Sequence, residues 1–258
     1  MPIAHVNGQP LHYLDEGTGT PIVLIHAFPF DSGMYRPQIE GLKGRFRIIA
    51  PDLRGFGKTA GGKNTTMDSH ATDVAALLDV LGIDHAIVGG VSMGGYVSLA
   101  LLRVAANKVS GLVLIDTQAT PDDAAGKAKR EENASKIEKE GIDFWVDANL
   151  PKLVAKDARA EVRDGVKAMI RSQTREGVAG GLRAMALRPD SRDMLARFGG
   201  KAVVIVGEHD EVTPLAKAQQ MAELVAGTRV VVIPGVGHLA NWESPAEVNR
   251  AIAEFVGR

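Results

Sequence analysis

The segment Gly90-Val91-Ser92-Met93-Gly94 places a serine between two glycines directly after a short apolar run. This G-x-S-x-G spacing is typical of a tight strand-to-helix turn that exposes a serine hydroxyl at the end of a sheet. The backbone at such a turn is too crowded for flanking side chains, which explains the glycines on both sides. Short patterns also arise by chance, so the prediction that Ser92 is a nucleophile depends on the rest of the chain.

A serine nucleophile needs a base to take its proton and a group that orients the base. In a parallel sheet, ligands bind beyond the carboxyl ends of the strands, so polar residues that follow apolar runs are the candidates. His238 follows the last apolar run and is the predicted base. Asp210 is the predicted orienting carboxylate, with Asp116 and Glu208 as open alternatives because each also follows an apolar run. Serine, aspartate and histidine then occur in the chain order expected of one catalytic arrangement.

Some of these polar residues also have plainer interpretations. A serine in front of a helix is often an N-cap, but a cap does not explain the glycines beside Ser92. We expect His26, which follows the first apolar run of the parallel sheet, to be structural, because a buried and hydrogen-bonded histidine is commoner than a second base. Asp52 and Arg54 are expected to hold the loop after their strand through local hydrogen bonds.

Apolar runs alternate with stretches of helical spacing, and this alternation predicts an α/β fold with a mostly parallel sheet and helices on both faces. Asn7-Gly8 between the first two runs indicates an N-terminal antiparallel hairpin. Strands are expected at residues 3–6, 9–14, 21–25, 46–50, 85–88, 109–115, 202–206 and 229–233, and helices at 72–81 and 245–256.

The alternation stops between residues 117 and 197, where the sequence is charged and helical in spacing without a convincing strand. We therefore predict a core made of residues 1–116 and 198–258, with residues 117–197 inserted as a helical cap, or lid. The charged run Lys127–Glu132 is expected to be a solvated helix face with i,i+4 ion pairs. Phe144 and Trp145 are aromatic residues of the cap that either face a pocket or pack within the cap.

Composition narrows the class of protein. The 258 residues are 45% hydrophobic and 24% charged, with a net charge of −1 and no cysteine. This balance favours a globular protein. The charges are too evenly mixed to create a broad positive electrostatic field that would attract nucleic acid or anionic lipid, so neither a nucleic-acid nor a membrane partner is expected. Disulfides, thiol nucleophiles and thiolate metal sites are excluded, and no histidine or carboxylate spacing indicates a metal or a cofactor. Residues 1–4 do not begin a charged and then apolar leader, so a cytoplasmic location is the expectation.

Together these motifs resemble the α/β-hydrolase fold, in the small, capped esterase and enol-lactonase-like branch. The resemblance covers essentially the whole chain and rests on segments that occur in family order, although Ala27 stands where the family usually has glycine. The segments are His26-Ala27-Phe28-Pro29, Asp52–Gly57, the turn at Ser92, Gly207–Asp210 and Gly237-His238. The resemblance implies Ser92, Asp210 and His238 as catalytic residues and the backbone N–H groups of Phe28 and Met93 as oxyanion donors. A substrate contact is also expected for Phe28, Trp145 and Leu239.

The predicted function is a serine hydrolase that cleaves a small ester or lactone through an acyl-enzyme, without metal or cofactor. One alternative is acyl transfer or perhydrolysis, in which another nucleophile replaces water. A second alternative is a ligand receptor of the same fold in which the triad barely turns over. Dehalogenase and epoxide hydrolase activity are disfavoured because those relatives use an aspartate where this chain has Ser92.

Overall fold

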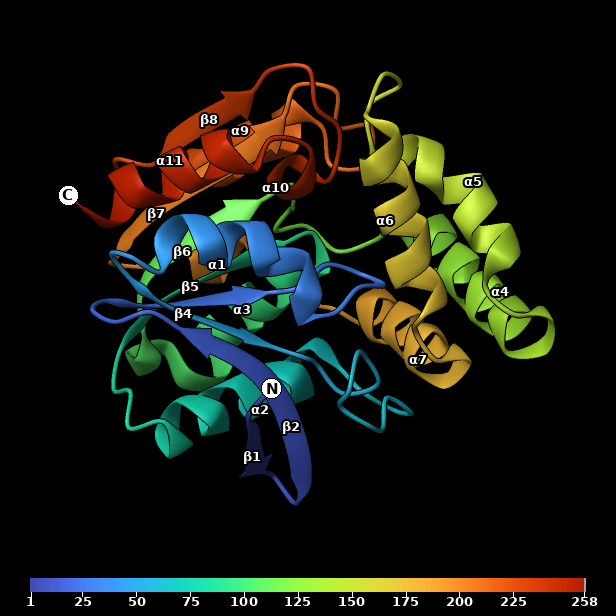
Figure 1. Ribbon diagram of the computed structural model, residues 1–258, viewed down its shortest axis with the longest axis horizontal. Helices are drawn as coiled ribbons and strands as arrows, with labels where there is room; N and C mark the ends of the chain where they lie inside the picture. Colours follow the sequence, from blue (N-terminus) through green and yellow to red (C-terminus); the bar gives the residue numbers. More distant parts are fainter. Residues whose placement is uncertain (258) are drawn as a thin grey trace.

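The computed structural model describes residues 1–257 and is built around one eight-stranded sheet (Figure 1). The strand order is β1-β2-β4-β3-β5-β6-β7-β8, with β1 and β2 antiparallel to their neighbours and the remaining pairs parallel. The strands are β1 (Ile3–Val6), β2 (Gln9–Glu16), β3 (Pro21–Ile25), β4 (Arg47–Pro51), β5 (Ala86–Val91), β6 (Val109–Ile115), β7 (Lys201–Gly207) and β8 (Arg229–Ile233). The predicted fold class is therefore confirmed.

The N-terminal hairpin forms where Asn7-Gly8 predicted it. Asn7 and Gly8 have φ angles of 49° and 81°, and two successive positive values are what a two-residue hairpin turn requires. The turn pairs β1 with β2, and β2 then pairs with β4. This antiparallel pair lies at one edge of the sheet, away from the strands that end at the predicted site residues (Figure 1).

Helices cover both faces of the sheet. Helix α1 packs on α11 and helix α2 packs on α3, each pair over a different face (Figure 1). The helices outside the 117–197 region are α1 (Arg36–Leu42), α2 (Met67–Val80), α3 (Met93–Ala105), α9 (Leu215–Ala222), α10 (Ala240–Glu243) and α11 (Pro245–Val256), with short 3-10 turns at Ser32–Tyr35 and Ala106–Lys108. The inner strands β3, β5, β6 and β7 are apolar and buried except near their starts, where Ser110 and Lys201 are exposed. A parallel sheet with two covered faces is buried on both sides.

Helix α2 begins five residues before the expected position of 72. Thr66 accepts a hydrogen bond from the Ser69 backbone N–H, and the Ser69 hydroxyl accepts one from the Thr66 backbone N–H. This reciprocal cap satisfies two backbone donors that would otherwise be unpaired, so the helix starts at Met67. Helix α11 spans the range expected for it.

Between β6 and β7 the described residues form helices joined by loops, and they include no strand. They are α4 (Ala124–Glu140), α5 (Asp143–Leu153), α6 (Ala160–Arg171), α7 (Arg175–Ala186) and α8 (Arg192–Ala196). Helices α4 to α7 stand together at one side of the sheet (Figure 1), with α4 packed on α7 and α5 on α6. The division into a core and a separate cap remains a prediction. Within residues 1–257 no helix has the length and apolar character to cross a bilayer.

Candidate active site

Ser92 lies in the one-residue gap between the end of β5 and the start of α3. Its φ and ψ angles are 54° and −111°, a conformation that non-glycine residues rarely adopt and that stores strain at functional turns. A Cβ at Gly90 would lie 2.3 Å from the carbonyl oxygen of Ile25, and a Cβ at Gly94 would lie 1.8 Å from the same atom. The turn therefore requires glycine at both positions, because the backbone on each side of Ser92 lies against the end of β3.

His238 and Asp210 form a buried pair. The Nδ1 atom of His238 lies 2.9 Å from Oδ2 of Asp210 and 3.0 Å from Oδ1. The Asp210 carboxylate also accepts the Thr213 hydroxyl at 2.7 Å and the backbone N–H groups of Val212 and Thr213. Burial alone would raise the pKa of Asp210, but the charge and hydrogen bond of His238 and the donors of Thr213 hold it below its usual range. Asp210 is thus poised as an anion against the imidazole.

The two alternative carboxylates lie elsewhere. Asp116 is fully buried, and its oxygens accept the backbone N–H groups of Gly207 at 2.8 Å and Ala240 at 3.1 Å. Burial raises the pKa of Asp116, and repulsion by Asp210 raises it further. Glu208 accepts the backbone N–H of Gly235 at 2.8 Å. Of the three candidates, the structure brings Asp210 to His238.

A cavity of about 280 Å³ brings Ser92 and His238 together with residues of the region between β6 and β7. Its lining combines apolar groups near the serine with polar groups from helices α4 and α5. The lining residues are Phe28, Ser92, Tyr96, Asp122, Gly126, Lys129, Arg130, Asn133, Trp145, Asn149, Lys152, Leu153, Leu182, Met185, Val212 and His238.

Two of the three residues expected to bind substrate line this cavity. Phe28 and Trp145 meet edge to face, with ring centroids 5.5 Å apart, and both contribute to the lining. Leu239 does not line it: its side chain is fully buried, and its backbone N–H donates to the carbonyl oxygen of Leu153. The backbone N–H groups of Leu239 and Ala240 are hydrogen-bonded to Leu153 and Asp116, which holds the Leu239 side chain in the interior. A residue next to a catalytic candidate therefore need not face the substrate.

Phe28 and Met93, the predicted oxyanion donors, lie on the loop after β3 and at the first position of α3. Over residues 1–257 neither backbone N–H donates to another protein group. The first N–H groups of a helix have no partner inside the helix, so Met93 offers a donor directly beside Ser92.

Sequence reasoning missed most of the polar cavity wall. Gly126, Arg130 and Asn133 follow helical spacing on α4, and Trp145, Asn149 and Lys152 do so on α5. The expectation of a fully solvated charged run was therefore wrong for Arg130, which is 23% exposed at the side chain and lines the cavity together with Lys129. The 3–4 residue spacing was the available signal, but it does not say which helix face points inward.

An ion-pair network supports this polar wall. Asp122 pairs with Arg130 and, at 2.8 Å, with Arg188, whose side chain is only 4% exposed. The Arg188 guanidinium lies 4.2 Å from the ring centroid of Tyr96, a cation–π contact with a cavity residue on the serine's helix. Burial alone would raise the pKa of Asp122, but the hydrogen bonds and charges of the two arginines lower it from 3.8 to about 2.

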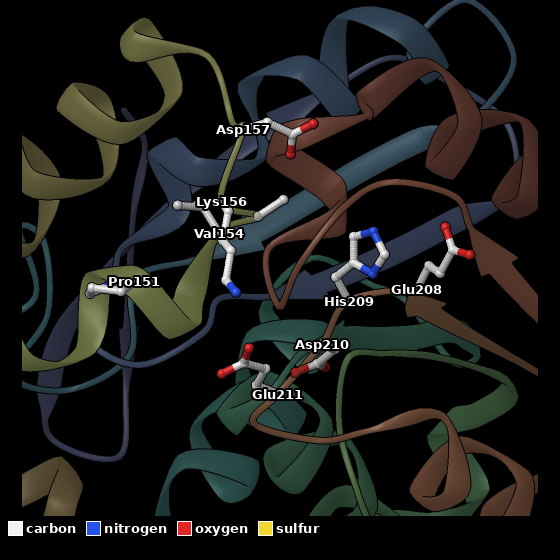
Figure 2. Close-up of a pocket in the computed structure, with 9 residues that line it drawn as sticks. Pro151, Val154, Lys156, Asp157, Glu208, His209, Asp210 and Glu211 are labelled. Atoms are coloured by element: carbon white, nitrogen blue, oxygen red, sulfur yellow. The ribbon is translucent and has the colours of Figure 1, made fainter.

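A second cavity, of about 480 Å³, has Asp210 in its lining. Figure 2 shows its two walls, the segment from Pro151 to Asp157 and the loop from Glu208 to Glu211 after β7. This cavity does not include Ser92 or His238 in its lining. The end of α5 thus lies between both cavities, because its last residue, Leu153, lines the first and the next residue, Val154, lines the second.

The remaining polar residues of the strand ends hold loops. His26 donates from Nδ1 to its neighbour's carbonyl and accepts the Leu53 backbone N–H at Nε2, and burial lowers its pKa. Asp52 accepts the backbone N–H groups of Ser32 and Lys58 and so holds its loop as expected. Arg54 instead pairs with Asp73 of helix α2, so its contact is not the local one that was expected. Across residues 1–257 no three His, Asp or Glu side chains are grouped to hold a metal ion.

Residues 20–245 match the sequence model of the alpha/beta hydrolase fold. The chain belongs to the α/β-hydrolase family. This α/β-hydrolase is similar to a malate-bound thermophilic esterase from Thermogutta terrifontis, with 38% identity, a TM-score of 0.94, and coverage of 96% of this chain and 93% of that one. An enol-lactonase structure from Burkholderia xenovorans LB400 gives 29% identity and a TM-score of 0.92, with both chains fully covered. Haloalkane dehalogenase 2 of Mycobacterium tuberculosis is 30% identical over 261 residues, which span 96% of this chain and 91% of the relative.

Proposed function

We propose that this α/β-hydrolase is a serine hydrolase that cleaves carboxylic esters or lactones through an acyl-enzyme. The observation that carries the proposal is that Ser92 and His238 line one cavity while Nδ1 of His238 is held by the buried Asp210 carboxylate. The likeness to an esterase and an enol-lactonase supports this choice. Dehalogenation is not proposed, although a haloalkane dehalogenase is among the relatives, because Ser92 has no carboxylate with which to displace a halide.

In the proposed reaction, the Ser92 hydroxyl attacks the carbonyl carbon while His238 takes its proton at Nε2. Asp210 holds the Nδ1–H, which fixes the tautomer and stabilises the imidazolium that forms. The negative charge on the carbonyl oxygen is stabilised by the backbone N–H groups of Phe28 and Met93, and one such donor contributes about 3 to 4 kcal/mol.

His238 then returns the proton to the departing alkoxide, which leaves the acyl group on Ser92. Water enters, gives a proton to His238 and attacks the acyl carbon, and collapse of the intermediate releases the carboxylic acid and restores the serine hydroxyl. In this scheme residues 117–197 act as a cap whose helices α4 and α5 close the cavity over the substrate.

The test is hydrolysis of p-nitrophenyl esters, from acetate to laurate, by the wild type and Ser92→Ala near neutral pH. Loss of a triad serine removes on the order of 10⁴ to 10⁶ of the rate, so turnover should vanish in the variant. Ser98→Ala is the matched control, because it removes a buried hydroxyl from the same helix that donates only to the Gly94 carbonyl. Equal rates for the wild type and Ser92→Ala would refute the proposal, and a single burst without turnover would favour a ligand receptor.

A further inference from the structure

The loop that carries His238 is held at several points by groups outside it. Asp116 accepts the backbone N–H of Ala240, and Leu153 accepts that of Leu239. Glu243, the last residue of α10, accepts the backbone N–H of Gly237 on Oε1 at 2.8 Å. The residues on both sides of His238 therefore donate to fixed acceptors.

Glu243 differs from the other acceptors because its second oxygen reaches the segment between α5 and α6. Oε2 accepts the backbone N–H of Ala155 at 2.9 Å. One carboxylate thus joins the His238 loop to the chain that leaves α5, the helix that contributes Trp145 and Lys152 to the cavity.

The two segments that Glu243 joins also touch directly. A Cβ on Gly237 would lie 2.8 Å from the Ala155 nitrogen and 2.9 Å from the Val154 carbonyl carbon, so glycine alone allows this approach. On the far side, Arg163 of α6 donates to the carbonyl oxygens of Ala155 and Lys156 and fixes the segment from the opposite direction. The backbone at Ala155 is therefore held between a carboxylate of α10 and a guanidinium of α6.

We propose that Glu243 is a positioning residue that sets His238 for proton transfer by tying the His238 loop to the 153–155 segment of the cap. This role rests on the proposed serine hydrolase function. Glu243 itself does not touch the cavity that contains Ser92. It acts through the two backbone N–H groups that it accepts, and a loss of either contact lets the imidazole and the end of α5 move independently.

Electrostatics agree with this geometry. Burial raises the pKa of Glu243, and repulsion by Asp157 adds to the effect, whereas the N–H donors of Ala155 and Gly237 and the charge of Arg163 oppose it. A carboxylate has two acceptor oxygens, whereas a side-chain amide has one acceptor oxygen and an NH₂ group that only donates. Glu243→Gln is therefore a sharp test, because its NH₂ group would face one of the two N–H donors while the side-chain shape is kept.

The experiment measures kcat and KM for p-nitrophenyl butyrate with Glu243→Gln and Glu243→Ala, per active site titrated with a serine-reactive organophosphonate. A catalytic group misplaced by about 1 Å costs up to about 100-fold, so we expect kcat to fall about 10- to 100-fold with KM changed less than about threefold. Hydrogen exchange at the amides of residues 155 and 237 should speed up together. Glu247→Gln is the matched control, because that carboxylate contacts only Ser244 and Arg250, and its kcat should stay within about twofold of wild type.

Unchanged kcat per site in Glu243→Gln, with Ser92-dependent turnover intact, would overturn the positioning role and leave the proposed function standing. Faster exchange with unchanged kcat would overturn it too, because Glu243 would then only stabilise the fold. Absence of Ser92-dependent turnover in the wild type would instead overturn the proposed function, and the positioning role with it. Glu243→Asp, which keeps the charge on a shorter side chain, replaces the other variants if neither folds.

Discussion

The two walls of the serine cavity are built in different ways. The wall from the sheet presents Ser92 and His238 on turns whose backbones touch other backbones, as the contact of Gly94 with Ile25 shows. The wall from α4 and α5 presents long polar side chains, with three cations, Lys129, Arg130 and Lys152, against the single carboxylate of Asp122. Backbone contacts leave little room for substitution, whereas flexible side chains are easily exchanged. Under the proposed function, we expect the sheet wall to carry the chemistry and the helical wall to select the substrate.

The largest effect should come from the carboxylate behind His238. Asp210→Asn replaces one acceptor oxygen with an NH₂ group, which cannot accept the Nδ1–H and favours the wrong imidazole tautomer. We expect kcat for p-nitrophenyl esters to fall by about 10⁴-fold, the scale seen when a triad aspartate becomes asparagine. Asp116→Asn should lower stability but cost far less in kcat per folded molecule, because Asp116 does not contact His238. A larger loss of kcat in Asp116→Asn than in Asp210→Asn would reverse the assignment.

The tight backbone of the sheet wall can be tested at Gly94. A Cβ there meets the Ile25 carbonyl oxygen at 1.8 Å, so Gly94→Ala must displace either β3 or the start of α3. We expect the free energy of unfolding in urea to fall by about 2 to 3 kcal/mol, as for other overpacked sites. Gly44→Ala is the control, because no atom lies within 4 Å of the added methyl, and its change should stay within about 0.5 kcal/mol. Equal stability of the two variants would contradict the contrast between the walls.

The stability that the helical wall adds should depend on pH, because Asp122 and its ion pairs lie in that wall. Its folded pKa of about 2 lies below the usual 3.8, so its ion pairs add stability above about pH 4 and lose it as the pH falls toward 2. Allowing for partial exposure of the site, Asp122→Asn should cost about 1 kcal/mol at neutral pH. The difference between wild type and variant in urea unfolding should shrink toward about pH 3. A difference that stays constant with pH would assign the loss to packing rather than to charge.

The smallest effect concerns selection by charge. Lys152 lines the cavity, so Lys152→Gln should raise KM for an anionic substrate such as the p-nitrophenyl half-ester of glutaric acid by about two- to fivefold. KM for the neutral p-nitrophenyl valerate, which is similar in size, should not change. Lys127→Gln is the control, because Lys127 is exposed on α4 outside the cavity lining. A similar change for both substrates would show that Lys152 acts through the shape of α5.

The sheet wall was predictable because the ends of parallel strands meet at one edge. Each apolar run in the sequence marks a strand, and the polar residue after it marks the edge, so His238 could be expected near a strand-end carboxylate. The same argument left Asp210, Asp116 and Glu208 open, and the contact that separates them is visible only in the structure. The helical wall was not predictable, since α4 buries only Ala134 and Ile137 in its 17 residues. Without an apolar stripe, the sequence does not indicate which face of a helix turns inward, and Lys129 and Arg130 were assigned to solvent.

The backbone of Ser92 has a consequence for how this chain tolerates change. With φ at 54°, the serine occupies a conformation that glycine adopts at no steric cost. Ser92→Gly should therefore relax the turn and raise the melting temperature while removing the proposed nucleophile. Selection for heat resistance alone would then favour an inactive sequence at this position, so any thermostability screen of this protein should keep turnover as a second criterion.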